Sequence, residues 1–108
     1  MRPIPLRLRK QLSDDPSMHK CAVAYLGGCR GRIEWDHVWI YAGRQINEPW
    51  AILAVCKHHH AAKEGDRVLK AHIQMASLRS ATDVDLAKYP RKNWYNELRN
   101  ARELTNLT

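Results

Sequence analysis

The pattern of apolar and polar positions is strand-like in the middle of the chain. Residues 32–41 and 50–55 are dense in β-branched and aromatic side chains, which favours two strands. Residues 42–49 contain glycine, asparagine and proline and predict the loop between them. From Cys56 the composition becomes helix-forming, and Gly65 is suited to end that helix. The central unit is therefore predicted to run strand, loop, strand, helix.

The residues before this unit follow other patterns. Residues 1–12 are basic and carry two prolines, so we expect an arm or edge segment rather than the start of a helix. The segment 21–25 is strand-like. The two glycines that follow it allow a sharp turn, through which Cys29 can face Cys21.

Helical spacing governs the last third of the chain. Apolar residues recur at this spacing between about residues 66 and 80 and predict an amphipathic helix. Thr82 and Asp85 resemble a capping box for a short helical turn. Asn93 can cap a last helix that carries Trp94 and Leu98 on one face. We therefore expect one α+β domain that ends in helices.

Composition narrows the class of protein. The chain has 108 residues and no Phe, with only four Trp and four Tyr, so we do not expect a rich aromatic core. Three cysteines argue against a fully paired disulfide framework. No apolar stretch approaches signal-peptide or membrane-spanning length. We expect a cytoplasmic protein with no membrane partner, whose thiols are free to bind metal.

Charge points to a polyanionic partner. Eighteen Lys and Arg against eleven Asp and Glu give a formal net charge of +7, and nucleic acid is the commonest partner of such a surface. A merely solvated basic surface is the alternative. The candidate DNA-binding residues flank the predicted strands or lie on the predicted helix: Arg30, Arg32, Arg44, Lys57 and Lys63.

Three cysteines and a histidine form the first candidate site. Zinc favours tetrahedral sulfur and nitrogen ligands, and the spacing from Cys56 to His59 is the short knuckle that structural zinc sites use. Cys21 and Cys29 would complete the set. The alternative is that the cysteines are small core residues. His58 remains open as the fourth ligand in place of His59.

A second group joins Asp36, His37 and His60. Asp36 and His60 would hold a divalent cation, and His37 would accept a proton from water. The unperturbed pKa of a histidine side chain is about 6.5, which suits a base at neutral pH. Glu64 is a further candidate ligand if the helix runs through it. Neighbouring residues of a regular strand point to opposite faces, so a shared cleft needs a bend at Asp36. The alternative is a surface Asp-His pair beside a solvated histidine.

Along residues 20–64 the chain has two cysteines, then Asp36 and His37, then Cys56 followed by His59 and His60. This order resembles that of the zinc-containing HNH endonucleases of the ββα-metal superfamily. The resemblance is greatest to small phage and prophage members. It implies a ββα core stapled by structural Zn²⁺, preceded by a basic arm over 1–19 and followed by a helical extension over 65–108. It also implies a bacterial host cytoplasm as the location.

The resemblance assigns a role to each residue of the two groups. His37 matches the general base, and Asp36 and His60 match the ligands of the catalytic cation. That cation is expected to be Mg²⁺ or Mn²⁺, with Ni²⁺ or Zn²⁺ as alternatives. The family's asparagine falls near Trp50, so Asn47 is the nearest substitute. Cys21, Cys29, Cys56 and His59 match the zinc ligands.

The expected function is hydrolysis of DNA phosphodiester bonds in recombination, branch resolution or packaging. The resemblance implies 5′-phosphate and 3′-hydroxyl products. A zinc-stabilised nucleic-acid-binding module without catalysis is the main alternative, and a structural or protein-interaction zinc domain is a third. The sequence leaves the oligomeric state open, a homodimer included.

Overall fold

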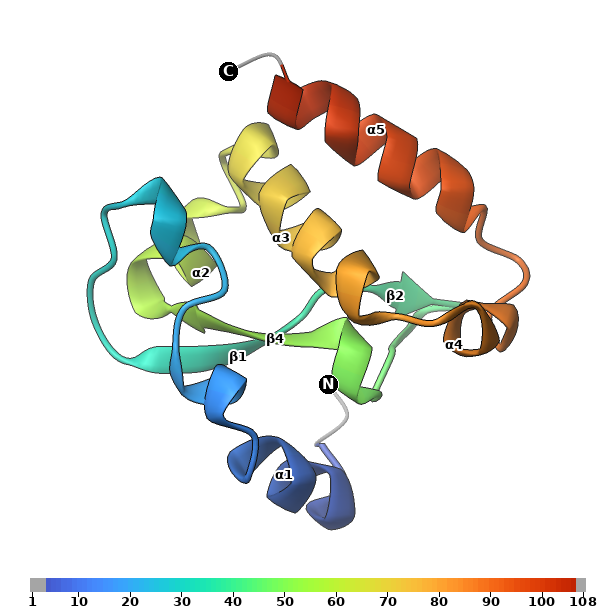
Figure 1. The fold of residues 1–108 in the computed structure, drawn as a ribbon, viewed down its shortest axis with the longest axis horizontal. Coiled ribbons are helices and arrows are strands. Elements are labelled where there is room, and N and C mark those ends of the chain that lie inside the picture. Colours follow the sequence, from blue (N-terminus) through green and yellow to red (C-terminus); the bar gives the residue numbers. More distant parts are fainter. Residues whose placement is uncertain (1–3, 107–108) are drawn as a thin grey trace.

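An antiparallel strand pair and the helix that follows it form the centre of the α+β fold (Figure 1). The computed structural model describes residues 4–106. β1 (Ile33–His37) pairs with β4 (Ile52–Cys56), and α2 (Lys57–Ala62) continues directly from β4. The predicted order of strand, loop, strand and helix is therefore confirmed.

Strand β4 is buried along its whole length because helices cover both faces of the pair. Ile52 and Ala54 pack with residues of α1 (Leu6–Ser13), whereas Leu53 and Val55 pack with residues of α3 (Arg67–Ser80). Cross-strand partners share a face. Asp36, opposite Leu53, thus lies on the α3 side, and His37, opposite Ile52, lies on the α1 side.

The predicted strand over 32–41 is divided in two. The chain leaves the β1–β4 ladder after His37 and forms a small hairpin from β2 (Ile40–Tyr41) and β3 (Arg44–Gln45). Ala42 and Gly43 make its turn with φ of 52° and 78°, the left-handed values that a tight hairpin turn requires. The break occurs where Trp39 enters the core.

The C-terminal helices begin at capping side chains, of which Thr82 and Asn93 were predicted from the sequence. Asp66 accepts a hydrogen bond from the Leu69 N–H at the start of α3. Thr82 and Asp85 form both halves of a capping box for α4 (Asp83–Ala87). Asn93 accepts from the Asn96 N–H at the start of α5 (Trp94–Asn106), which packs along α3 (Figure 1). None of the described helices is both long and apolar enough to span a membrane.

Two expectations for the N-terminal third are wrong. Residues 6–13 form helix α1 because Leu8 and Leu12, four residues apart, bury one face against the strand pair. Pro5 precedes the first helical residue, where a proline breaks no helical hydrogen bond. The segment 21–25 forms no strand; it leads into a 3₁₀ turn at Ala24–Leu26.

The expectation of a core poor in aromatic residues is also wrong. Trp39, Trp50 and Trp94 are buried together, and the ring of Trp94 contacts the other two edge-to-face at centroid distances of 5.1 and 5.6 Å. Buried Ser77 accepts from Trp39 Nε1 at 2.9 Å and donates to the Trp50 carbonyl at 2.6 Å. The few aromatic residues of the chain are concentrated in one place.

Candidate metal centres

Four side chains converge at the start of α2. The sulfurs of Cys21, Cys29 and Cys56 lie 3.4, 3.7 and 3.2 Å from Nδ1 of His59. All four donor atoms lie within 4.8 Å of one another. Tetrahedral zinc with ordinary bond lengths separates sulfur from nitrogen by about 3.6 Å. The four residues are therefore close enough to hold a metal ion, as expected from the sequence.

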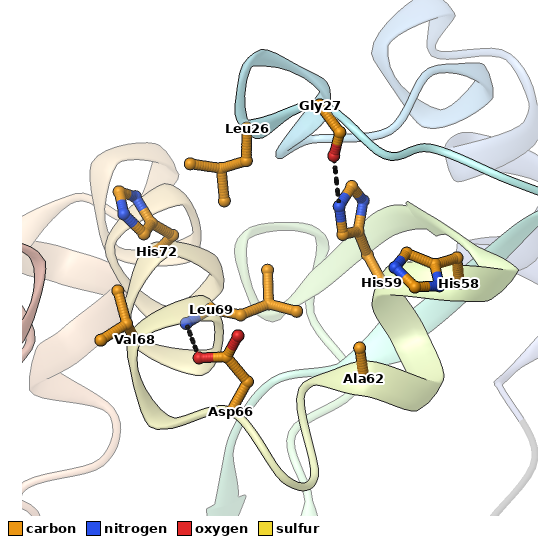
Figure 2. Close-up of a pocket in the computed structure, with 9 residues that line it drawn as sticks. All are labelled: Leu26, Gly27, His58, His59, Ala62, Asp66, Val68, Leu69 and His72. Carbon is orange, nitrogen blue, oxygen red and sulfur yellow. Dashed lines mark hydrogen bonds between the residues drawn. The ribbon is translucent and has the colours of Figure 1, made fainter. Parts of the chain in front are cut away.

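The His59 ring is oriented for ligation through Nδ1. Its Nε2 lies 2.9 Å from the Gly27 carbonyl oxygen, which can only accept, so Nε2 carries the hydrogen and Nδ1 carries the lone pair. Figure 2 shows the Gly27 carbonyl pointing at the ring and the His58 ring lying apart from it. His58 is exposed and is not part of the converging group, which settles the alternative in favour of His59.

Local geometry builds this centre from two short segments. Cys56 is the N-cap of α2, and its sulfur accepts the backbone N–H of His59, so the helix start fixes the second pair of ligands. Gly27 and Gly28 both have φ of 78°, which a side chain would strain. Gly31 lies so close to Lys57 that a Cβ there would meet the lysine Cβ at 2.8 Å.

The electrostatics of the thiols favour a bound cation. Desolvation of its sulfur raises the pKa of Cys29 to about 11, although the residue as a whole is exposed, and hydrogen bonds with Cys21 and Cys56 add to the rise. Burial also raises the pKa of Cys56, but hydrogen bonds from the backbone N–H groups of His59 and Arg30 outweigh it and leave the pKa lowered. Three such neighbouring thiols ionise together only beside a counter-charge, which a divalent cation supplies.

A second group lies one residue further along α2. His60 Nδ1 is 2.8 Å from Glu34 Oε1, and His60 Nε2 is 3.5 Å from Asp36 Oδ1. Glu34 and Asp36 are two apart on β1 and so point to the same side. The hydrogen bond from His60 lowers the pKa of Glu34, which therefore accepts as a carboxylate. With Nδ1 facing Glu34, Nε2 is the ring nitrogen that faces Asp36.

Asp36 is only partly satisfied within the described residues. The residue is 3% exposed, and its Oδ2 is buried without a hydrogen-bond partner. Its Oδ1 forms an ion pair with Lys63. A buried carboxylate oxygen without a partner is costly. The 3.5 Å between Asp36 Oδ1 and His60 Nε2 is a separation that two ligands of one divalent cation can have, since neighbouring ligands lie about 3–3.5 Å apart.

His37 contacts Asn47 and not this group. Its Nε2 lies 2.7 Å from Asn47 Oδ1, so Nε2–H donates and Nδ1 keeps the lone pair. The β1–β4 ladder is regular through His37, without the bend considered above. The side chains of Asp36 and His37, the last two residues of β1, therefore point to opposite faces of the strand. The displaced Asn47 nevertheless reaches the predicted base.

The remaining candidates are placed differently from the sequence expectation. Helix α2 ends at Ala62, so Glu64 lies in the following turn, and its side chain is 73% exposed rather than beside His60. Lys63 turns inward to Asp36 and is not a surface contact for DNA. The other basic candidates are exposed: Arg30, Arg32, Arg44 and Lys57.

Sequence reasoning missed Glu34, which belongs to the second group. The signal was its alternation with Asp36, which places both carboxylates on the same face of the strand as the following helix.

No protein-family model, curated protein or solved structure matches the chain. A functional assignment for this chain therefore rests on the chemistry of the two groups of side chains.

Proposed function

We propose that the chain is a metal-dependent endonuclease of the zinc-containing HNH type, which hydrolyses DNA phosphodiester bonds. In this proposal β1, β4 and α2 form the ββα core. The observation that carries it is the chain of contacts from Glu34 through His60 to Asp36, whose second carboxylate oxygen is buried without a partner. A histidine held by one carboxylate and aimed at another is the usual arrangement of a metal ligand.

The chain's own residues divide the work of hydrolysis. The Asp36 carboxylate and His60 Nε2 would hold a divalent cation, and Glu34 holds the His60 ring through Nδ1. When bound, the cation polarises the phosphate and stabilises the departing 3′ oxygen. His37 Nδ1 accepts a proton from the attacking water, and Asn47 holds the ring through Nε2.

The end of β1 is where these roles meet. Asp36 and His37 are consecutive and leave the strand on opposite faces, so a phosphodiester must lie across the strand end to contact both. β1 stops at His37, and Val38, the next residue, donates its backbone N–H to the Ala51 carbonyl before the chain enters the β2–β3 hairpin. In this proposal the substrate would lie over the end of β1, within reach of both Asp36 and His37.

The Cys₃His centre has a structural role in this proposal. It would hold zinc and fix the first turn of α2 against the 21–29 segment. Because His59 and His60 are adjacent, this fixes the position of His60 as well. Exposed Arg30, Arg44 and Lys57 supply sequence-independent attraction for the phosphate backbone, in keeping with the net charge of +7.

One observation favours a second candidate, a zinc-stabilised nucleic-acid-binding module without catalysis. The Lys63 ammonium group contacts Asp36 Oδ1 and neutralises it. A lysine in this position competes with a divalent cation for the carboxylate. In the nuclease, Lys63 would share Asp36 with the cation; in the binding module, it would replace the cation.

A plasmid-nicking assay separates the two candidates. Zinc-loaded protein should nick supercoiled DNA when Mg²⁺ or Mn²⁺ is added, and His37→Ala should slow nicking by about 100-fold or more while keeping its zinc. His19→Ala removes an exposed histidine bonded only to the Ser13 carbonyl and is the matched control. Protein that binds DNA but cuts no duplex, branched or single-stranded substrate with Mg²⁺, Mn²⁺, Ni²⁺ or Zn²⁺ would establish the binding module.

A further inference from the structure

A cleft of about 540 Å³ lies between the β2–β3 hairpin and the segment after α4. Its walls include Tyr41, Arg44, Gln45, Asn47 and Tyr89. In Figure 1 the hairpin lies beside α4, on the opposite side of the molecule from α2. The volume is within the range of small-ligand sites and is large enough for one nucleotide.

The cleft adjoins the proposed catalytic base. Asn47 lines the cleft, and its Oδ1 accepts the hydrogen bond from His37 Nε2 at 2.7 Å. One side chain therefore separates the cleft from the imidazole. A ligand in the cleft would be a direct neighbour of a phosphate bound at the end of β1.

The walls of the cleft are aromatic and held in place. The rings of Tyr41 and Tyr89 meet edge-to-face with centroids 5.1 Å apart. The Tyr41 hydroxyl accepts the backbone N–H of Arg91 at 3.0 Å, and the Tyr89 hydroxyl donates to Glu48. Because both hydroxyls have protein partners, the two rings are held in place on the wall of the cleft, where the face of one ring can stack on a base.

Two polar groups of the cleft lack protein partners. Within residues 4–106, Gln45 Oε1 is buried without a hydrogen bond, and the exposed Arg44 guanidinium forms no ion pair. Because that oxygen has no exposed surface, a ligand N–H reaches it only when the Gln45 side chain turns into the cleft that it lines, and the lack of a protein partner favours that turn. A phosphate would suit the guanidinium. A flat ring, an N–H group and a phosphate are together the features of a nucleotide.

We infer that this cleft binds one unpaired nucleotide of the DNA substrate, next to the phosphate that is cut. The inference rests on the proposed function for the identity of the neighbouring phosphate. A base within a duplex is stacked and paired, so it reaches such a cleft only when it is bulged, flapped or flipped out. The protein should therefore prefer DNA with an unpaired nucleotide over a perfect duplex.

The test compares a perfect duplex with the same duplex carrying a single bulged nucleotide. Binding is measured by fluorescence anisotropy on zinc-loaded protein without added divalent cation, and cleavage is measured separately with Mn²⁺. The wild-type protein should bind the bulged duplex about tenfold more tightly, which is within the range of stacking one base on an aromatic side chain. Gln45→Leu should reduce this ratio to about one. Gln74→Leu, on α3 and outside the cleft, should leave it unchanged.

A second variant covers a failure of Gln45→Leu to fold. Arg44 is exposed, so Arg44→Ala should fold and should weaken binding of the bulged duplex more than binding of the perfect duplex. Arg99→Ala, on the exposed face of α5, should change both affinities in equal proportion.

The outcomes distinguish this inference from the proposed function. Equal binding of the two duplexes by the wild-type protein would overturn the nucleotide cleft, and continued cleavage of both would leave the nuclease proposal standing. A bulge preference that depends on Gln45 without any cleavage would support the cleft and overturn the nuclease. Failure to bind either duplex would overturn both.

Discussion

His59 and His60 are neighbours on α2, yet they belong to sites of opposite character. His59 is 4% exposed, and three sulfurs surround its Nδ1. The His60 side chain is 32% exposed, and its Nε2 faces a single carboxylate. The first group offers four donors, the number that a structural zinc site uses, whereas a cation held by the second group would keep most of its coordination positions open.

Under the proposed function, this difference would let one short helix serve both stability and chemistry. The Cys₃His group, which we call the closed group, lies at the N-terminal turn of α2, where Cys56 caps the helix and Gly27 orients His59. The group of Glu34, Asp36 and His60, which we call the open group, lies on the side of α2 facing β1, where Glu34 orients His60. In each group a hydrogen bond to one ring nitrogen sets which nitrogen is free to bind.

The largest expected effect comes from opening the closed group. Cys56→Ser removes a metal ligand and weakens the cap of α2, so we expect loss of zinc and a fall of about 4 kcal/mol or more in the free energy of unfolding. Metal content by mass spectrometry and thermal melting by circular dichroism measure both. His58→Ala, adjacent to the ligands but outside the group, should change neither. Normal melting of metal-free Cys56→Ser protein would show that the cysteines are merely core residues.

A smaller effect is expected from loosening the open group. Glu34→Gln keeps a hydrogen-bonding side chain but removes the charge that orients His60, so affinity for Mn²⁺ should fall about 10–100-fold. Isothermal titration of zinc-loaded protein with Mn²⁺ measures this, with exposed Glu103→Gln as the control. An unchanged Mn²⁺ affinity would remove Glu34 from the site. Zinc content and melting should stay at wild-type values in either case.

The smallest effect concerns the residue that positions the base. Asn47→Ala removes one hydrogen bond to His37, and a bond of about 1 kcal/mol corresponds to a five- to tenfold slower nicking of plasmid DNA. Exposed Asn100→Ala on α5 should nick at the wild-type rate. If Asn47→Ala loses activity as completely as His37→Ala, the asparagine acts directly on substrate or on folding. No loss at all would mean that the 2.7 Å contact has no part in the reaction.

Features that depend on local sequence were predictable. The caps at Thr82 and Asn93 were found because a capping side chain bonds to an N–H two or three residues ahead. The strand pair followed from its β-branched residues. The four metal donors followed from the preference of zinc for sulfur and imidazole.

Features that depend on distant partners were not predictable. Leu8 and Leu12 form a helix because strand β4 offers them a surface to bury, and two prolines obscured that pattern. The tryptophan cluster collects residues from three separate segments, so counting aromatic residues missed it. Lys63, the C-cap of α2, points inward to Asp36, a contact with a distant strand that the composition of residues 56–64 did not reveal.

The division between the two groups is tested most directly by His59→Ala and His60→Ala, examined side by side for zinc content, melting and plasmid nicking with Mn²⁺. His60→Ala should keep one zinc per chain and the wild-type melting temperature while nicking about 100-fold more slowly or not at all. His59→Ala should lose zinc, cooperative melting and activity together. Loss of zinc in both variants, or undiminished nicking by His60→Ala, would contradict the assignment of the adjacent histidines to separate metal sites.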